Sequence, residues 1–157
     1  ALLFLAKLCV MLGLLAQFFF VLNVGMILGA YLPAWLLPSV AGPAAAIPVK
    51  MLAQRSLLFF VDTLPIVAVQ YGIGLRFRNV LAPIGAGMGI WIMSVGMLSW
   101  RKAYLLPYNH PALHFFRLAK PEMNHAILVN LPALALGCFL VGCLIGLAIY
   151  LRSSQRS

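Results

Sequence analysis

The sequence predicts an all-α membrane protein, an antiparallel bundle of four transmembrane helices with a short interfacial segment in the last loop. Apolar residues make up 64% of the 157 residues and charged residues only 8%, whereas soluble domains average roughly 45–50% and about 25%. Four apolar runs, each near the roughly 20 residues needed to cross a bilayer core, are joined by shorter connections. The pattern indicates a single transmembrane domain over residues 1–157 and excludes a soluble globular fold.

The four helices are expected at residues 8–32, 56–75, 80–100 and 126–151. Three of these runs carry no formal charge, and only the second contains an acid. The first run is too long for the apolar core of a signal peptide and has no basic start followed by a cleavage site. We therefore expect it to remain in the mature chain as a spanning helix.

The three connections differ in character. Residues 33–48 contain four prolines and no charge, which breaks regular helix while keeping the segment near the membrane surface. Residues 76–79 form a tight polar turn between neighbouring antiparallel helices. Residues 101–125 are the longest polar segment, and we expect one short interfacial helix at about 112–119. Basic residues number five on the side of the termini and six on the other, so the positive-inside rule does not choose an orientation.

The net charge of +9, from eleven Lys and Arg against two acids, falls between the apolar runs. It forms no continuous patch that could follow a phosphate backbone, so the expected partner is membrane lipid and no nucleic acid is expected. Cys9, Cys138 and Cys143 all lie inside apolar runs, where a free cysteine behaves as a small hydrophobe. Neither a disulfide framework nor a cysteine metal pair is predicted.

Three of the predicted helices carry glycines four residues apart, a spacing that lets helix backbones approach closely in lipid. The pairs are Gly25 and Gly29, Gly85 and Gly89, and Gly142 and Gly146. Packing within the chain is the favoured interpretation, and a dimer interface is the alternative.

Asp62 is the one acid inside a predicted span, and an ionisable group in lipid is costly unless it faces protein or water. Three roles stay open: a solvated or loosely paired position near the interface, a proton-coupling group, or a pathway for a cationic peptide together with Gln70 or Asn23. Pro65 lies mid-span, where it frees a backbone carbonyl and is a candidate hinge. Pro83 falls where a helix should begin.

His110, His114 and His125 fall in one loop, and Pro111 argues against a regular helix presenting the first two. We therefore interpret them as exposed loop residues and predict no metal site. No phosphate-binding glycine loop, Ser-His-Asp order or HExxH motif is present, so no catalytic residue is predicted.

Residues 62–89 read DTLPIVAVQYGIGLRFRNVLAPIGAGMG. This stretch resembles the permease subunits of ABC-2 type ATP-binding-cassette transporters, in particular the branch of lantibiotic immunity and peptide-antibiotic export. The matching residues are Leu64, Pro65, Gln70, Leu75, Arg76, Phe77, Asn79, Pro83, Ile84, Gly85 and Gly87. Arg78 stands where the family usually has Lys. A weaker match is Leu106-Pro107-Tyr108 with Pro111, similar to a segment that follows the fifth span of that family.

The resemblance implies a permease subunit in the bacterial plasma membrane that exports or expels an amphipathic peptide such as a lantibiotic. Its implied partners are a separate ATP-binding subunit, which holds the ATP and Mg, and a second permease subunit in a homo- or heterodimer. The family has six spans, so this chain resembles the last two thirds of a subunit, with cytoplasmic termini and a cytoplasmic turn at Arg76, Phe77, Arg78 and Asn79. Arg76 and Arg78 would either anchor the turn at the headgroups or contact the ATP-binding subunit.

An intramembrane enzyme acting on lipid or isoprenoid substrates, or a small membrane assembly protein, remains the alternative. Such enzymes generally need clustered acids for a divalent metal, whereas this chain has only Asp62 and Glu122.

Overall fold

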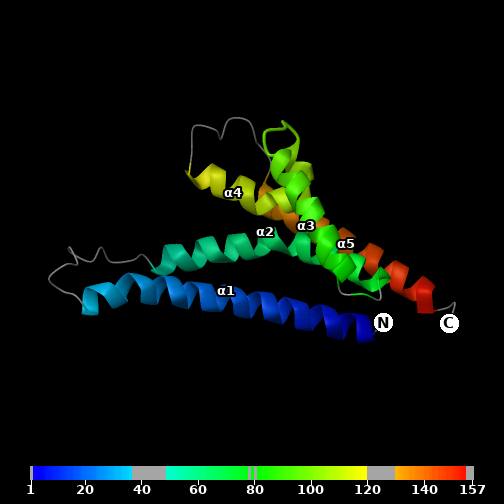
Figure 1. The fold of residues 1–157 in the computed structure, drawn as a ribbon, viewed down its shortest axis with the longest axis horizontal. Coiled ribbons are helices and arrows are strands. Elements are labelled where there is room, and N and C mark those ends of the chain that lie inside the picture. Colours follow the sequence, from blue (N-terminus) through cyan, green and yellow to red (C-terminus); the bar gives the residue numbers. More distant parts are fainter. Residues whose placement is uncertain (1, 37–48, 78, 80, 120–129, 155–157) are drawn as a thin grey trace.

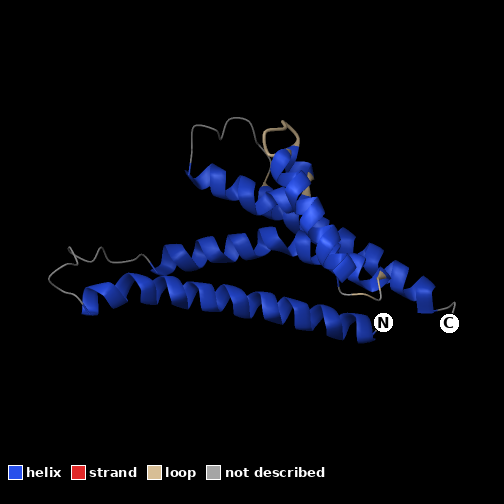
Figure 2. Cartoon of the chain, viewed as in Figure 1, coloured by secondary structure: helices blue, strands red, loops and turns tan. Residues whose placement is uncertain are grey.

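A computed structural model of the chain describes residues 2–36, 49–77, 79, 81–119 and 130–154. Within these residues the regular structure is entirely helical, and no strand is formed (Figure 2). The long elements are α1 (Leu2–Leu36), α2 (Val49–Arg76), α3 (Leu81–Gly96), α4 (His110–Ala119) and α5 (Leu131–Ser154). Two 3-10 turns, η1 (Ala103–Leu105) and η2 (Pro107–Asn109), join α3 to α4.

Three of the helices are long and apolar enough to cross a membrane, as expected for a helical membrane protein. These stretches are Leu2–Gly29, Val49–Arg76 and Leu131–Arg152. The second helix begins seven residues before the predicted residue 56, and it takes in Lys50 and Arg55 as a basic first part. The all-helical prediction is therefore confirmed for the described residues.

The third predicted span is shorter than expected, because α3 has 16 residues. At 1.5 Å per residue it is about 24 Å long, less than the roughly 30 Å hydrocarbon core. After Gly96 the backbone tightens: Leu98 N–H donates to Val95 O and Trp100 N–H to Met97 O, each three residues back. The turn ends the helix before Trp100, so length supports three spans rather than the four that were predicted.

Helix α2 lies at the centre of the arrangement and contacts α1, α3, α4 and α5, most extensively α5. Helices α1 and α2 lie side by side and run in opposite directions (Figure 1). The start of α1 and the end of α5 lie at the same end of the molecule as the end of α2 and the start of α3 (Figure 1). The predicted antiparallel bundle of four helices is not confirmed, because α3 and α5 are inclined to the α1–α2 pair (Figure 1).

The packing of α2 on α5 depends on small residues. A Cβ placed on Gly142 would lie 2.8 Å from the Cβ of Ala68, closer than real Cβ contacts allow. Gly146 faces the ring of Phe4, with 3.6 Å between its would-be Cβ and the ring carbons. The predicted pair on α5 thus packs inside the chain. Around Gly25, Gly29, Gly85 and Gly89 the described residues leave the Cβ position open to at least 4 Å.

The start of α1 is tied to α2 and α5 by a buried aromatic cluster. The Tyr71 hydroxyl donates a 2.8 Å hydrogen bond to Phe4 O. The Phe4 ring lies 5.0 Å from the Tyr71 ring and 5.9 Å from the Tyr150 ring, centroid to centroid. Tilted aromatic pairs at these distances add to the burial energy of their surface. The cluster fixes the first turn of α1 against α2 and α5.

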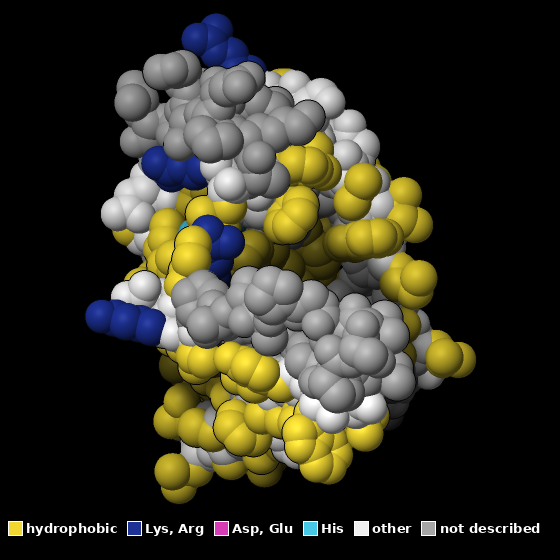
Figure 3. Space-filling model, turned by 90° about the vertical axis from the view of Figure 1, so that its left-hand side faces the viewer, with side chains coloured by type: hydrophobic (Ala, Val, Ile, Leu, Met, Phe, Trp, Pro, Cys, Tyr) yellow, Lys and Arg dark blue, Asp and Glu magenta, His cyan; other side chains and the backbone are white. Residues whose placement is uncertain are grey.

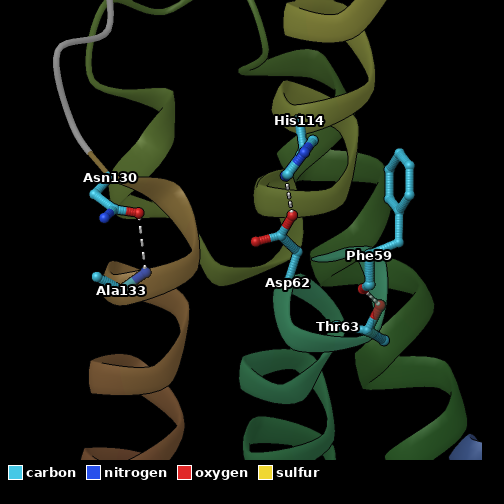
Figure 4. Close-up of polar contacts among 6 residues, drawn as sticks. All are labelled: Phe59, Asp62, Thr63, His114, Asn130 and Ala133. Carbon is cyan, nitrogen blue, oxygen red and sulfur yellow. Dashed lines mark hydrogen bonds and ion pairs between the residues drawn. The ribbon is translucent and has the colours of Figure 1, made fainter. Parts of the chain in front are cut away.

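Asparagine side chains cap two of the helices. The Asn79 Oδ1 accepts from Leu81 N–H at 3.0 Å at the start of α3, and Asn130 Oδ1 accepts from Ala133 N–H at 3.4 Å at the start of α5 (Figure 4). These bonds satisfy amide groups that have no partner within the helix. Pro83 lies in the first turn of α3, where its missing N–H costs no helical bond, as predicted.

The surface is dominated by hydrophobic side chains. Figure 3 looks at one end of the molecule and shows hydrophobic atoms over most of its coloured area, with basic side chains at the top and in the left half of the view. Large apolar residues such as Phe20, Leu144 and Met93 are 68%, 66% and 64% exposed. Lipid is the solvent that suits such a surface.

Candidate functional site

Asp62 is fully buried on α2 and meets a histidine from α4. The Nδ1 of His114 lies 2.5 Å from Oδ2 of Asp62, and the two side chains point toward each other (Figure 4). The Phe59 ring, one turn earlier on α2, packs 5.3 Å from the His114 ring. The expectation of a solvated Asp62 is therefore wrong, because its side chain is buried and paired.

The expectation that His110 and His114 are exposed loop residues is also wrong. Both lie on α4, at 0% and 8% exposure, and with Leu113 they form the face that is turned inward. Pro111 does not prevent this helix, because it falls in the first turn, where a helix makes no backbone bond through its N–H. His125 lies outside the described residues.

Helix α4 is amphipathic, but its histidines are buried and its phenylalanines are exposed. Its buried face carries the two histidines, while Phe115 and Phe116 are 58% and 43% exposed beside Arg117. This is the distribution expected of a helix that lies against protein on its polar face and against lipid on its apolar face. The short helix predicted at about 112–119 is present as α4.

The segment before α4 is held by hydrogen bonds from buried polar side chains. The Asn109 amide donates to Ala103 O at 3.3 Å, and the His110 Nε2 lies 2.8 Å from Tyr104 O. Because that carbonyl can only accept, His110 carries its proton on Nε2 in this contact. The two bonds fold η1 back on η2 and thereby position the first turn of α4.

An adjacent carboxylate and imidazole can share or pass a proton, and they partly neutralise each other's charge when both are ionised. The second carboxylate oxygen, Asp62 Oδ1, has no hydrogen-bond partner among the described residues. Within the same residues no three His, Cys, Asp or Glu side chains come close enough together to hold a metal ion. Cys9 lies on α1, and Cys138 and Cys143 lie on α5; all three are free cysteines.

The three residues predicted to line a substrate pathway do not share one site. Asp62 pairs with His114, as described above. Asn23 on α1 accepts a 2.7 Å hydrogen bond from the Ser56 hydroxyl on α2 and donates to Phe19 O in its own helix. Gln70 lies instead near the end of α2, against Gly87 of α3. Each polar group thus joins a different pair of elements.

Gln70 lines a cavity of about 480 Å³ between α2, α3 and η2, to which α1 contributes Met11. We call it the Gln70 cavity; its wall includes Gln70, Pro83, Ile84, Gly87, Trp91 and Tyr108. A second cavity, of about 470 Å³, lies between α1 and α2 and includes Asn23, Ser56 and the rings of Phe19, Phe20 and Phe60. Both volumes fall in the range of about 300–1,000 Å³ that is typical of small-ligand pockets.

Tyr108 brings a second polar group to the Gln70 cavity. Its side chain is only 7% exposed. Burial raises the pKa of Tyr108, and the nearby Gln70 side chain offsets part of that rise. The two groups do not reach hydrogen-bond geometry, and the Tyr108 hydroxyl has no hydrogen-bond partner in the part of the chain that the structure describes.

The structure also shows where the candidate hinge Pro65 and part of the α2–α3 turn lie. Pro65 is fully buried inside α2, three residues after Asp62, where it cannot donate to the carbonyl of Val61. Arg76 ends α2 and is exposed, as is Phe77, and Asn79 caps α3. Arg78 lies outside the described residues.

Sequence reasoning missed His114, Ser56 and Tyr108 as partners of the polar residues it did single out. One signal for His114 was available: a single acid in an apolar span needs a basic partner, and two histidines four apart share a helix face.

No protein-family profile, no curated protein and no solved structure matches this chain.

Proposed function

We propose that the chain is a membrane-spanning permease subunit of an ATP-driven ABC-2 type exporter, with several spans in the bacterial plasma membrane. Its cargo is an amphipathic peptide such as a lantibiotic, which it exports or expels. ATP and Mg are bound by a separate ATP-binding subunit, and a second permease subunit completes the transporter.

One observation carries the proposal. The residues that resemble the ABC-2 permeases come from two separate segments, 62–89 and 106–111, and members of both line the same cavity. Gln70 comes from the end of α2, Gly87 from α3, and Tyr108 from the 3-10 turn before α4. A chance likeness in two apolar segments would give no reason for the matched residues to meet around one space.

The α2–α3 turn is the proposed contact for the ATP-binding subunit. The end of α2 lies at the same end of the molecule as the start of α1 and the end of α5 (Figure 1), and Arg76 and Phe77 present a cation beside an exposed ring. An exposed aromatic beside an arginine is typical of protein–protein contacts. Arg152, at the end of α5, is a cation at the same end of the molecule and serves as the control for Arg76.

Co-purification from membranes tests the proposal. The full subunit is co-expressed with the ATP-binding proteins of its source, solubilised in mild detergent and isolated through an affinity tag. We expect an ATP-binding protein to co-purify, and ATP hydrolysis by the complex to rise in the presence of the exported peptide. Exchanging Arg76 for Glu should weaken the complex, whereas Arg152→Glu should leave it intact.

Retention of the complex in both variants would overturn the assigned contact, and absence of any ATP-binding protein would overturn the permease. Chemical turnover of a lipid by the purified chain alone would instead favour the intramembrane enzyme. In that case Asp62 and His114 would be the first residues to substitute, because they form the closest acid–base pair of the described residues.

A further inference from the structure

The polar groups of the Gln70 cavity are all uncharged. Gln70 supplies an amide that both donates and accepts, and Tyr108 supplies a hydroxyl that does the same. The other wall residues are apolar: Met11, Ile66, Pro83, Ile84, Met88 and Trp91, besides Gly87. Among the described residues no carboxylate or cationic side chain lines it, and Asp62 is paired with His114 instead.

The Gln70 amide is held at the wall by a glycine. A Cβ on Gly87 would overlap Nε2 of Gln70, so only glycine at that position lets the amide lie against the α3 backbone. Gly87 is buried, whereas Gly85, two residues earlier on the same helix, has open space at its Cβ position among the described residues. The amide is thus placed by the packing of two helices.

Tyr108 carries a hydrogen-bonding capacity that the protein leaves unused. Its hydroxyl is buried and lacks a partner among the described residues, although an unsatisfied buried polar group costs about 1–3 kcal/mol. A ligand group that hydrogen-bonds with the hydroxyl would recover that cost. Three lining side chains of α3 are exposed, Ile84 at 53%, Trp91 at 55% and Met88 at 60%, and they give the cavity an apolar opening.

We propose that the Gln70 cavity binds an uncharged amide carried on an apolar chain, with Gln70 and Tyr108 hydrogen-bonding to the amide and the chain lying against Pro83, Ile84 and Trp91. An amide suits the site because it donates and accepts at once, as both side chains require. A cationic head is excluded, because the site has no negative charge to offset the cost of removing it from water.

As the binding place of an exporter's cargo, this assignment rests on the proposed function, and it implies that an apolar, neutral portion of a peptide enters first. As a binding site it needs neither ATP nor a partner subunit. Binding can therefore fail while co-purification succeeds, or succeed while co-purification fails, so the two proposals are tested separately.

Quenching of Trp91 fluorescence by a brominated probe tests the site. Trp35→Phe and Trp100→Phe leave Trp91 as the only tryptophan of the 157 residues. The protein is placed in unbrominated lipid nanodiscs, and dibrominated stearamide is compared with a trimethylammonium compound that has the same brominated chain. We expect saturable quenching by the amide and, from the ammonium compound, only the linear quenching of a probe dissolved in lipid.

Three variants link the quenching to the site. Gln70→Leu and Tyr108→Phe should each weaken binding about fivefold, the equivalent of one neutral hydrogen bond of about 1 kcal/mol. Gly87→Ala should weaken it as well, because the added methyl displaces the Gln70 amide, whereas Gly85→Ala should not change it. Tyr108→Phe removes a single oxygen, so it reports on the site even if a Gln70 variant fails to fold.

Linear quenching by both probes, equal to partition into lipid, would overturn the assignment. Saturable quenching that all three substitutions leave unchanged would also overturn it, because the probe would then occupy another part of the surface near Trp91. Saturable binding of the ammonium compound as tight as that of the amide would refute the selection for an uncharged group.

Discussion

His114 Nδ1 lies 2.5 Å from Asp62 Oδ2, which joins a short surface helix to the central membrane helix through the one acid among the described residues. A carboxylate in an apolar span is costly to bury alone, and the imidazole supplies the partner that offsets this cost. The pair also brings α4 against the midpart of α2, three residues before Pro65. A bend of α2 at Pro65 would therefore change how α4 packs against α2.

Asp62→Asn should reduce transport or peptide resistance while leaving membrane insertion intact. The substitution removes the charge that His114 faces, and leaving a buried polar partner unsatisfied costs about 1–3 kcal/mol. Insertion depends on the apolar runs, which are unchanged. Resistance of cells that carry the full subunit, measured beside the amount of protein in the membrane fraction, checks the prediction.

The matched control for Asp62 is Thr63→Val, because the Thr63 hydroxyl donates only to Phe59 O in its own helix (Figure 4). His114→Asn should resemble Asp62→Asn, and the double variant should cost less than the sum of the two, as for residues in direct contact. Strictly additive effects would show that the pair is not coupled, and unchanged transport would make Asp62 purely structural.

Gly142→Ala should destabilise the packing of α2 on α5, whereas Gly137→Ala should not. A methyl on Gly142 meets Ala68 Cβ at 2.8 Å, while the same group on Gly137 meets no described atom within 4 Å. Overpacking of this kind typically costs about 1–3 kcal/mol. Thermal unfolding in one detergent, followed by circular dichroism, compares the two variants. Equal midpoints would mean that α5 does not approach α2 at this point.

Tyr71→Phe should lower the stability of the end of the molecule that holds the N-terminus. It removes the 2.8 Å hydrogen bond to Phe4 O but keeps the ring that packs on Phe4. The expected loss is about 0.5–1.5 kcal/mol, the net contribution of one such bond. Tyr31→Phe, at an exposed tyrosine, is the control. Proteolysis within residues 2–8 should become faster in the first variant only.

Tyr108 should lose its proton at a higher pH than an exposed tyrosine. Burial raises its pKa above the ordinary value of about 10 because the charged form is poorly solvated there. Its contribution to stability is accordingly present below that ordinary pKa and is lost as the pH rises through the raised one. The tyrosinate absorbance of the protein minus that of Tyr108→Phe isolates this group. A component that titrates at or below pH of about 10 would show an exposed Tyr108.

The helical class and the positions of the long helices could be predicted from apolar runs alone, because a chain of this composition can bury its backbone polar groups in lipid only as helices. The boundaries were less accurate. Helix α3 ends at Gly96 instead of residue 100, since a turn of i to i−3 hydrogen bonds replaces the helix although the residues remain apolar. Hydropathy does not register such a change.

For the candidate site, the sequence indicated the polar residues but not their partners. Asp62, Gln70 and Asn23 were identified because polar groups in apolar spans are conspicuous, but the structure places each of them against a different element. Their partners come from positions distant in sequence, such as His114 for Asp62 and Ser56 for Asn23. Periodicity assigns a residue to a face of its own helix but does not say which helix that face meets.

The sequence by itself determined that this chain is helical and apolar enough for a membrane. Its composition leaves too much apolar surface to be buried away from water, and the length of its apolar runs matches the thickness of a bilayer. The tertiary structure alone decided that the histidines are buried and that Gln70 and Tyr108 share a cavity. Such pairings depend on the crossing and spacing of helices, which follow from close contacts such as Gly142 on Ala68. These contacts are set by three-dimensional packing, and a linear pattern of hydrophobicity contains no record of them.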